Sequence, residues 1–404
     1  MTKSNESIRE YKWCLLLLCI LPILDPYAIN GSGSVMIVNV IALFLAMCCV
    51  LTTKISMNQT FLSLIFYFLV SSILSGFFTS STSIDFVLEA KVLFAWMILL
   101  VSFSFLWRYT NKKNFYKIMV GVGVACAGLA LIQYIALYIG FSNIYDGRLP
   151  FPIGDNNDFG GLVDINTGDI RVHSFFEEPS YLSIFELPIF AYCLKNKKIL
   201  SAVIIGLTCI ITSTLLGIIG LSIVLTYCIL FDTSLSVLQR IFIAFVAVII
   251  ISVLIYLGNN NPYVSDLFNY YSHRFSGVEG DFDREDSSVS LRLVGNISYF
   301  EDYPLLNKIF GVGFNQHGVY FKLKKNYSND IVSTIMDFGI LGLIAFIITM
   351  VVLFFKINRE GKVYFIILIM VMMVDHIWFN TYFFYLMTWC TFHFKKNDDI
   401  CLKL

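Results

Sequence analysis

The chain has 404 residues and no net charge, because 28 Lys and Arg balance 28 Asp and Glu, and 57% of its residues are hydrophobic. Only 14% are charged, against about 25% in a typical soluble domain, so polar residues are too few to coat one or two soluble cores. This composition excludes a soluble enzyme, a disordered chain and a nucleic-acid-binding protein.

Apolar runs of membrane-spanning length follow one another along the chain. A span takes about 20 residues, and hydropathy predicts about twelve of them in a single polytopic membrane domain over 1–404. They lie near 12–29, 33–53, 60–79, 86–107, 115–140, 180–194, 199–212, 215–231, 241–257, 331–355, 363–378 and 381–394. The stretch 199–231 could be one long helix, but its polar break at 212–214 favours two. The predicted fold is an all-α integral membrane protein.

Lys and Arg near the span ends predict the orientation. With both termini in the cytoplasm, 18 of the 28 basic residues lie in inner segments, and the short outer loops contain none. Nine others lie in two long outer loops, 141–179 and 258–330, and Lys91 lies within a span. Cytoplasmic loops carry the excess of Lys and Arg in membrane proteins. We therefore expect both termini in the cytoplasm and both long loops on the opposite side.

The sequence shows no pattern typical of a metal or cofactor site. Most of its ten cysteines lie inside apolar runs, where a buried thiol acts as a small hydrophobic group. Gly-rich phosphate loops and zinc-ligand spacings are also absent. We expect neither a metal nor a cofactor.

Several ionisable residues lie within the predicted spans, and five of them are assigned to the outer half of the membrane. They are Glu89, Lys91, Glu186, Asp337 and Asp375, the last followed by His376. Intramembrane charges are costly and suggest function. The shared depth suggests a polar cavity that opens outward. The alternative is that each carboxyl pairs with a neighbouring span and serves helix packing.

The long outer loops contain the strongest candidates for chemistry. The first places Arg171, His173, Glu177 and Glu178 within eight residues, directly before a span. The second contains Arg274, Arg292 and His317. Arg clamps phosphate oxygens with a rigid fork, and a carboxylate can take a proton from a sugar hydroxyl. The pattern suits an amphiphile with an anionic head, although an Arg171–Glu177 bridge and solvated loops would be ordinary structural alternatives.

Three motifs resemble a known family, the bacterial O-antigen and capsular polysaccharide polymerases (Wzy-type), which are related to the O-antigen ligases. The first runs from Arg171 through Phe176-Glu-Glu-Pro-Ser180, and the second joins Ser290-Leu-Arg292 to Phe310-Gly-Val-Gly313. The third is Ser328-Asn329 followed by Asp337-Phe-Gly-Ile-Leu-Gly342, and the run from Thr212 to Gly217 adds weak support. Ser328 stands where ligases usually keep a His, which favours a polymerase.

The resemblance implies a metal-independent, GT-C-like glycosyltransferase of the bacterial inner membrane, with its active face in the periplasm. It would transfer a glycan from undecaprenyl diphosphate to the end sugar of another lipid-linked repeat unit. Arg171 and Arg292 would bind the diphosphate. Glu178 would orient or deprotonate the acceptor hydroxyl, and Glu177 is the second candidate for that role. Expected partners are lipid-linked oligosaccharides, the bilayer and a chain-length regulator protein. Further candidates for sugar or phosphate contacts are His173, Arg274, His317 and Asn329.

Two alternatives stay open at this stage. An O-antigen ligase would use the same donor but a different acceptor. A flippase or secondary transporter for the same lipid-linked sugars would use Glu89, Glu186 and Asp337 as proton-coupling groups. The two long loops favour chemistry outside the membrane.

Overall fold

The computed structural model describes most of the helical part of the chain. The described residues are 12–29, 36–52, 66–67, 69–70, 73–74, 86–109, 111–141, 143–154, 161–163, 170–212, 214–231, 241, 297–322 and 328–394. The predicted span 241–257, apart from residue 241, and most of 60–79 lie outside these residues, as do the site candidates Arg274 and Arg292.

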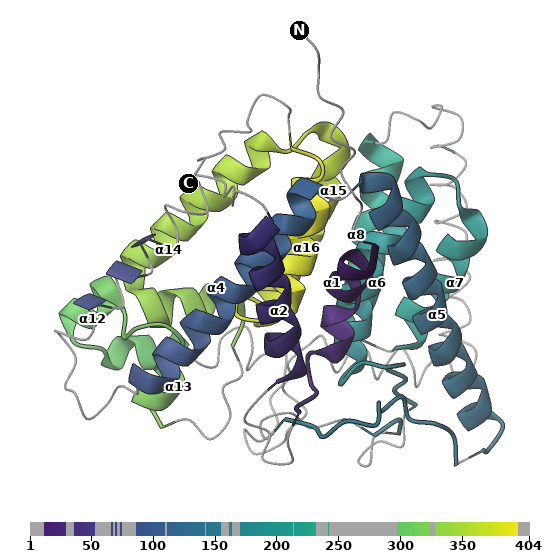
Figure 1. Ribbon diagram of the computed structural model, residues 1–404, viewed down its shortest axis with the longest axis horizontal. Coiled ribbons are helices and arrows are strands. Elements are labelled where there is room, and N and C mark those ends of the chain that lie inside the picture. The colour runs from purple at the N-terminus through teal and green to yellow at the C-terminus, as the bar shows by residue number, and fades with distance from the viewer. Residues whose placement is uncertain are drawn as a thin grey trace, which may run out of the picture.

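The regular secondary structure of the described residues is helical, and strand-like pairing there is limited to isolated bridges such as Tyr27–Ile153 (Figure 1). The α-helices are α1 (Lys12–Leu24), α2 (Ile37–Thr52), α4 (Phe86–Tyr109), α5 (Lys112–Tyr138), α6 (Pro179–Lys195), α7 (Ile199–Ile211), α8 (Leu215–Phe231), α12 (Leu305–Phe310), α13 (His317–Tyr320), α14 (Asp330–Lys356), α15 (Lys362–Val374) and α16 (Thr381–Thr391). Two short 3-10 helices are η3 (Ile297–Asp302) and η4 (Arg359–Gly361). This confirms the all-α prediction for the described part of the chain.

Two of the described helices, Lys112–Tyr138 and Asp330–Lys356, are long and apolar enough to cross a membrane. Each has 27 residues and is therefore about 40 Å long at 1.5 Å per residue. The apolar helices α1, α2, α7 and α8 are shorter.

Local polar groups explain where several helices begin and end. The stretch 199–231 forms two helices, because the chain breaks after Ile211 and the Thr214 hydroxyl then accepts a hydrogen bond from Gly217 N at 3.1 Å. The predicted span 363–378 is wrong at its end, since α15 stops at Val374. Asp375 is extended there, and Asn380 caps α16 by accepting from Tyr382 N at 3.0 Å.

Helices α5, α6, α7 and α8 run in alternating directions between two ends of the bundle, and so do α14, α15 and α16. We name these ends after the first and last residues of α6, the Pro179 end and the Lys195 end. At the Pro179 end, Trp378 N donates to Asp330 Oδ1 and Tyr382 OH donates to Pro22 O. At the Lys195 end, Asn358 N donates to His393 O. The Pro179 end faces down in Figure 1.

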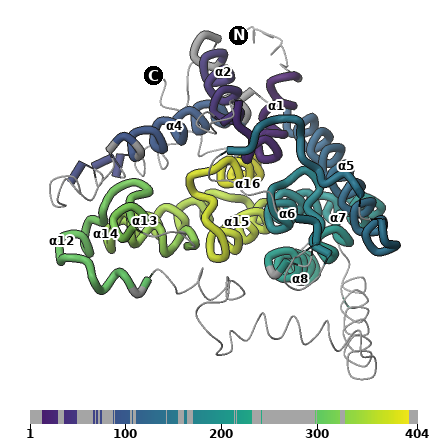
Figure 2. The backbone as a smooth tube through the Cα atoms, turned by 90° about the horizontal axis from the view of Figure 1, so that it is seen from below, coloured from purple at the N-terminus to yellow at the C-terminus, as the bar shows by residue number. Residues whose placement is uncertain are grey.

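The core of the bundle is aromatic and centres on α16. Trp389 is fully buried and stacks on Tyr116 of α5, with Tyr364 of α15 against it at 5.2 Å between ring centroids. Figure 2 shows α15 and α16 in the middle, with α14 on one side and α6 on the other. The loops that follow α1, α7 and α15 lie at the Pro179 end, together with the start of α6.

Candidate functional site

The segment 170–178, which leads into α6, is held in place by α5. Gln133 of α5 accepts from Ser174 N at 2.9 Å and donates from Nε2 to Tyr145 O at 3.2 Å. Ser174 has a φ of 57°, and Gly147 packs so closely that a Cβ on it would lie 1.5 Å from Ser174 O. Because the backbone is fixed on both sides, the side chains of this segment have a defined starting position.

Arg171 and His173 lie on this segment at different depths. Arg171 is half-buried, and its backbone N donates to Leu162 O at 2.8 Å. His173 is fully buried. Arg171 is therefore placed to meet a ligand, whereas His173, expected as a substrate contact, lies beneath the surface and supports the segment.

Glu177 and Glu178 lie at the start of α6, and both are half-buried. Glu178 occupies the N-cap position with extended backbone, and Pro179 follows as the first helical residue. Its carboxylate makes no capping hydrogen bond and instead accepts from the Ser180 hydroxyl at 3.1 Å.

Carboxylates from three distant parts of the chain surround one tyrosine pair. Tyr382, at the start of α16, stacks on Tyr181 of α6 with 4.8 Å between ring centroids. Asp25, Glu177 and Asp375 all lie close enough to the Tyr382 hydroxyl to act on it electrostatically. The stack therefore brings the Glu177 side of α6 next to the turn between α15 and α16.

Asp25 belongs to this group, although the sequence did not single it out. It follows the last residue of α1, Leu24, and precedes Pro26. Asp25 is half-buried, and the Thr381 side chain lies close to its carboxyl. The sequence signal that could have identified Asp25 is an acidic residue directly before a proline at the end of an apolar run.

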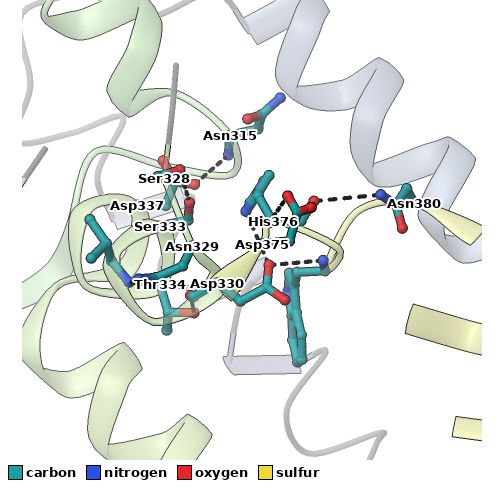
Figure 3. A network of polar contacts seen from close by, with 12 residues as sticks. Asn315, Ser328, Asn329, Asp330, Ser333, Thr334, Asp337, Asp375, His376 and Asn380 are labelled. Carbon is teal, nitrogen blue, oxygen red and sulfur yellow. Dashed lines mark hydrogen bonds and ion pairs between the residues drawn. The ribbon is translucent and has the colours of Figure 1, made fainter. Parts of the chain in front are cut away.

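A second feature of this group is an aspartate–histidine pair between α14 and the 375–380 turn. The first residue of α14, Asp330, places Oδ1 3.0 Å from His376 Nδ1 and accepts from Trp378 N at 2.9 Å. Asp375 accepts from His376 N at 2.8 Å (Figure 3). The Asp330 side chain is fully buried, whereas 23% of the His376 side chain is exposed. Both ring nitrogens of His376 are buried, so the exposed part of its side chain is carbon.

Another carboxylate of α14, Asp337, is used in a different way. It accepts from the backbone N of Asn315, Gln316 and His317 at 3.0–3.1 Å, and His317 Nδ1 lies 2.8 Å from its Oδ1. Neither the Asp337 nor the His317 side chain is exposed. His317, expected as a substrate contact, therefore anchors its own loop to α14.

Two glycines make this contact possible. Gly311 and Gly339 have φ values of 79° and 67°, where L side chains are strained. A Cβ on Gly311 would lie 2.0 Å from Asp337 O, and one on Gly339 would lie 2.3 Å from Ile309 O. The motifs 310–313 and 337–342 are thus two halves of one backbone contact, which also breaks α14 at Gly339.

The other intramembrane carboxylates of the described residues also lack a shared cavity. Glu89 accepts from Phe314 N at 2.8 Å and is 6% exposed. Glu186 is fully buried, with Cys209 Sγ 3.9 Å from its Oε2. Each contacts a different part of the fold, so the packing alternative describes Glu89 and Asp337 better than a ring of cavity carboxylates does.

Asn329 and the 212–217 run also have structural partners. Asn329 caps α14 by accepting from Val332 N at 2.9 Å and is 4% exposed. Near the start of α6, the hydroxyls of Ser183, Thr212 and Thr214 lie 3.0–3.3 Å from one another. This buried hydroxyl cluster joins α6 to the turn between α7 and α8.

The structure thus places Glu177, which shares a segment with Arg171 and Glu178, near Asp25 and Asp375 through the Tyr181–Tyr382 stack. Among the described residues, no group of three or more His, Cys, Asp or Glu is arranged to hold a metal ion. Neither a protein-family model nor a curated protein matches this sequence. The function is therefore inferred from the residues themselves.

Proposed function

We propose that the chain is an integral membrane protein with about twelve spans, both termini in the cytoplasm and the Pro179 end in the periplasm. Large apolar side chains face outward along α14, among them Ile347 and Ile348, which are 51% and 58% exposed. Such a surface suits lipid, not water. The Lys195 end is rich in cations, and within the part described its one carboxylate is Glu360; the cations there include Lys112, Lys113, Lys195, Lys197, Lys198, Arg359 and Lys362. An excess of Lys and Arg marks the cytoplasmic side.

The function we propose is that of an O-antigen or capsular polysaccharide polymerase, a glycosyltransferase in the bacterial inner membrane. The observation that carries it is the placement of Arg171 and the Glu177–Glu178 pair on one fixed segment at the Pro179 end. Anion-binding and proton-accepting groups beside an apolar bundle suit a substrate with a lipid tail, a diphosphate and sugars. The resemblance of the same segment to the polymerase family supports this assignment.

The proposed reaction joins two lipid-linked glycans. The acceptor sugar hydroxyl attacks the anomeric carbon of the donor, the bond from that carbon to the diphosphate oxygen breaks, and the hydroxyl proton passes to a carboxylate. Glu178 would take this proton, with Glu177 next to it. Arg171 would hold the diphosphate and stabilise the negative charge that it gains as it leaves. Arg292 would share this role, and the products are the lengthened glycan and free undecaprenyl diphosphate.

His376 is a second candidate for the base. Its Nδ1 lies 3.0 Å from Oδ1 of the buried Asp330, and a carbon part of the side chain is exposed at the Pro179 end, so Nε2 would have to become accessible when the acceptor binds. Asp375 connects it to the Tyr181–Tyr382 stack and hence to Glu177. His376 and Glu178 are thus competing assignments for one role.

The alternatives predict different behaviour. A flippase that uses Glu89 and Asp337 for proton coupling would have to release carboxylates that hold backbone amides of the 314–317 loop. A ligase would need the same groups as the polymerase but would leave finished chains unattached when the protein is deleted. Only the polymerase lengthens lipid-linked repeats.

Purified protein incubated with lipid-linked repeat units and no ion gradient tests this proposal. We expect a ladder of longer lipid-linked glycans, and Arg171→Ala should slow their formation about 10²–10³-fold, the usual effect of removing one group that stabilises a leaving charge. Arg148→Ala is the matched control, because Arg148 lies in the same loop, is 47% exposed and pairs with Asp146. Transport without elongation would overturn the proposal. Normal ladders from Arg171→Ala would overturn the role of Arg171.

A further inference from the structure

A cavity of about 440 Å³ lies at the Lys195 end, away from the proposed catalytic site. Its lining includes Lys113 of α5, Lys195 of α6, Tyr227 of α8 and both Arg359 and Glu360 of η4. These four separate elements contribute to one pocket, at the end that the proposed orientation places in the cytoplasm.

The walls of this basic-end pocket are fixed by packing and hydrogen bonds. Tyr227 OH donates to Arg359 O at 2.8 Å, and Lys195 Nζ donates to Glu360 O at 2.9 Å, so η4 is tied to both α8 and α6. Tyr116 stacks on Tyr192 with 4.4 Å between ring centroids. These contacts keep the pocket open without a ligand inside it.

The pocket has an excess of positive charge. Lys113, Lys195 and Arg359 face one carboxylate, Glu360. These three cations exceed the one anion by two charges.

An apolar groove of about 480 Å³ lies beside this pocket, between α8, α14 and α15. Ile223 lines the groove and Tyr227 lines the pocket, and residues four apart share one face of a helix. Lys362 Nζ lies 4.3 Å from the centroid of the Phe354 ring, another groove residue, and adds a cation at the same end. A charged pocket and an apolar groove that share one helix match the charged headgroup and the acyl chain of a lipid.

We propose that this pocket and groove bind one acidic phospholipid, with its phosphate among Lys113, Lys195 and Arg359 and an acyl chain along α8 and α15. Basic pockets at the cytoplasmic ends of membrane helices recognise anionic headgroups in this way. The site is independent of the proposed glycosyl transfer, and its occupant would brace α6 and α8 against η4 at the end opposite the chemistry.

Native mass spectrometry of the delipidated full-length protein tests this proposal, with phosphatidylglycerol as the probe and phosphatidylcholine of the same chain length as the comparator. We expect phosphatidylglycerol to bind at least tenfold more tightly. The double variant Lys113→Gln/Arg359→Gln should lose about tenfold in affinity, since a charge-assisted contact to phosphate contributes more than a neutral one. Lys117→Gln is the matched control, because Lys117 is exposed one turn along α5 and does not line the pocket.

Two further arms separate the lipid from other sources of phosphate. Ile369→Trp should fill the groove and weaken phosphatidylglycerol binding, because Ile369 lines it. Inorganic phosphate at millimolar concentration should not displace the lipid. Equal binding of both lipids, an equal loss in Lys117→Gln, no effect of Ile369→Trp, or displacement by inorganic phosphate would each overturn the proposal, and thermal melting in detergent confirms that every variant is folded.

Discussion

Two aspartates of α14, Asp330 and Asp337, each pair with a histidine from another part of the chain. The two pairs differ in how exposed the histidine is. In the Asp337–His317 pair both side chains are fully buried, and three backbone amides also donate to the carboxylate. In the Asp330–His376 pair the carboxylate is buried, but 23% of the histidine side chain is exposed. The residue types are the same, and only in the second pair is part of the histidine side chain exposed.

This difference shows how one helix can serve both fold and chemistry. The Asp337 pair holds the 311–317 loop against the break in α14, and both oxygens of the Asp337 carboxylate accept hydrogen bonds from that loop. The Asp330 pair binds a single turn, 375–380, that lies beside the Glu177 side of α6. We therefore expect changes at the first pair to unfold the protein and changes at the second to slow it.

The largest expected effect comes from Gly311→Ala. The new Cβ would lie 2.0 Å from Asp337 O at a φ of 79°, so the 311–317 loop could no longer dock on α14. Strain of this kind, together with loss of a buried charge contact, costs about 3–5 kcal/mol. We expect no monodisperse protein in size-exclusion chromatography.

Gly140→Ala provides the matched control for this change. Gly140 has a similar φ of 89°, but no atom lies within 4 Å of the position of its Cβ. The substitution should cost only about 1 kcal/mol and leave a folded protein. If both variants fold equally well, the close contact at Asp337 is not what stabilises the loop.

The next effect separates the two histidines. His376→Ala should slow elongation about 10²-fold or more, the usual contribution of a general base, while the melting temperature stays close to that of the unaltered protein. His317→Ala should do the opposite, because it leaves the buried Asp337 without its side-chain partner and costs about 3 kcal/mol. Elongation rates and thermal melts of both variants are the measurements.

Asp330→Asn sharpens this test. The amide oxygen can still accept from Trp378 N, but the side chain no longer offers His376 a carboxylate. The elongation rate should therefore fall about as far as in His376→Ala. The double variant should show no further loss. If His376→Ala elongates at a normal rate, the base is Glu178 and the exposed pair is structural as well.

The sequence predicted the helices well because burial in an apolar environment dominates their formation. Long apolar runs locate α5 and α14, and the polar break at 212–214 locates the split between α7 and α8. The end of α15 was missed, because hydropathy over 363–378 does not register that Asp375 prefers an extended backbone and hydrogen-bonds its own neighbour, His376. Local polar contacts of this kind decide a boundary without changing the average hydropathy.

The candidate site was predicted where it is local and missed where it is not. Arg171, Glu177 and Glu178 follow one another in the chain, so their proximity is visible from spacing alone. Asp25 and His376 join them only through helix packing over more than 100 residues. The same packing shows that His317 and Asp337, two separate candidates in the sequence, pair with each other.

The smallest expected effect concerns Asp25, a carboxyl that acts on the Tyr382 hydroxyl together with Glu177 and Asp375. Asp25→Asn keeps the shape of the side chain and removes one of these three acidic groups, so the free energy of unfolding should change by no more than about 1 kcal/mol. Thermal melting in detergent measures this change, with Asp146→Asn, whose side chain is 42% exposed, as the control. A loss much larger than that of Asp146→Asn would show that the Asp25 carboxyl itself, and not only its shape, holds the end of α1 against the start of α16.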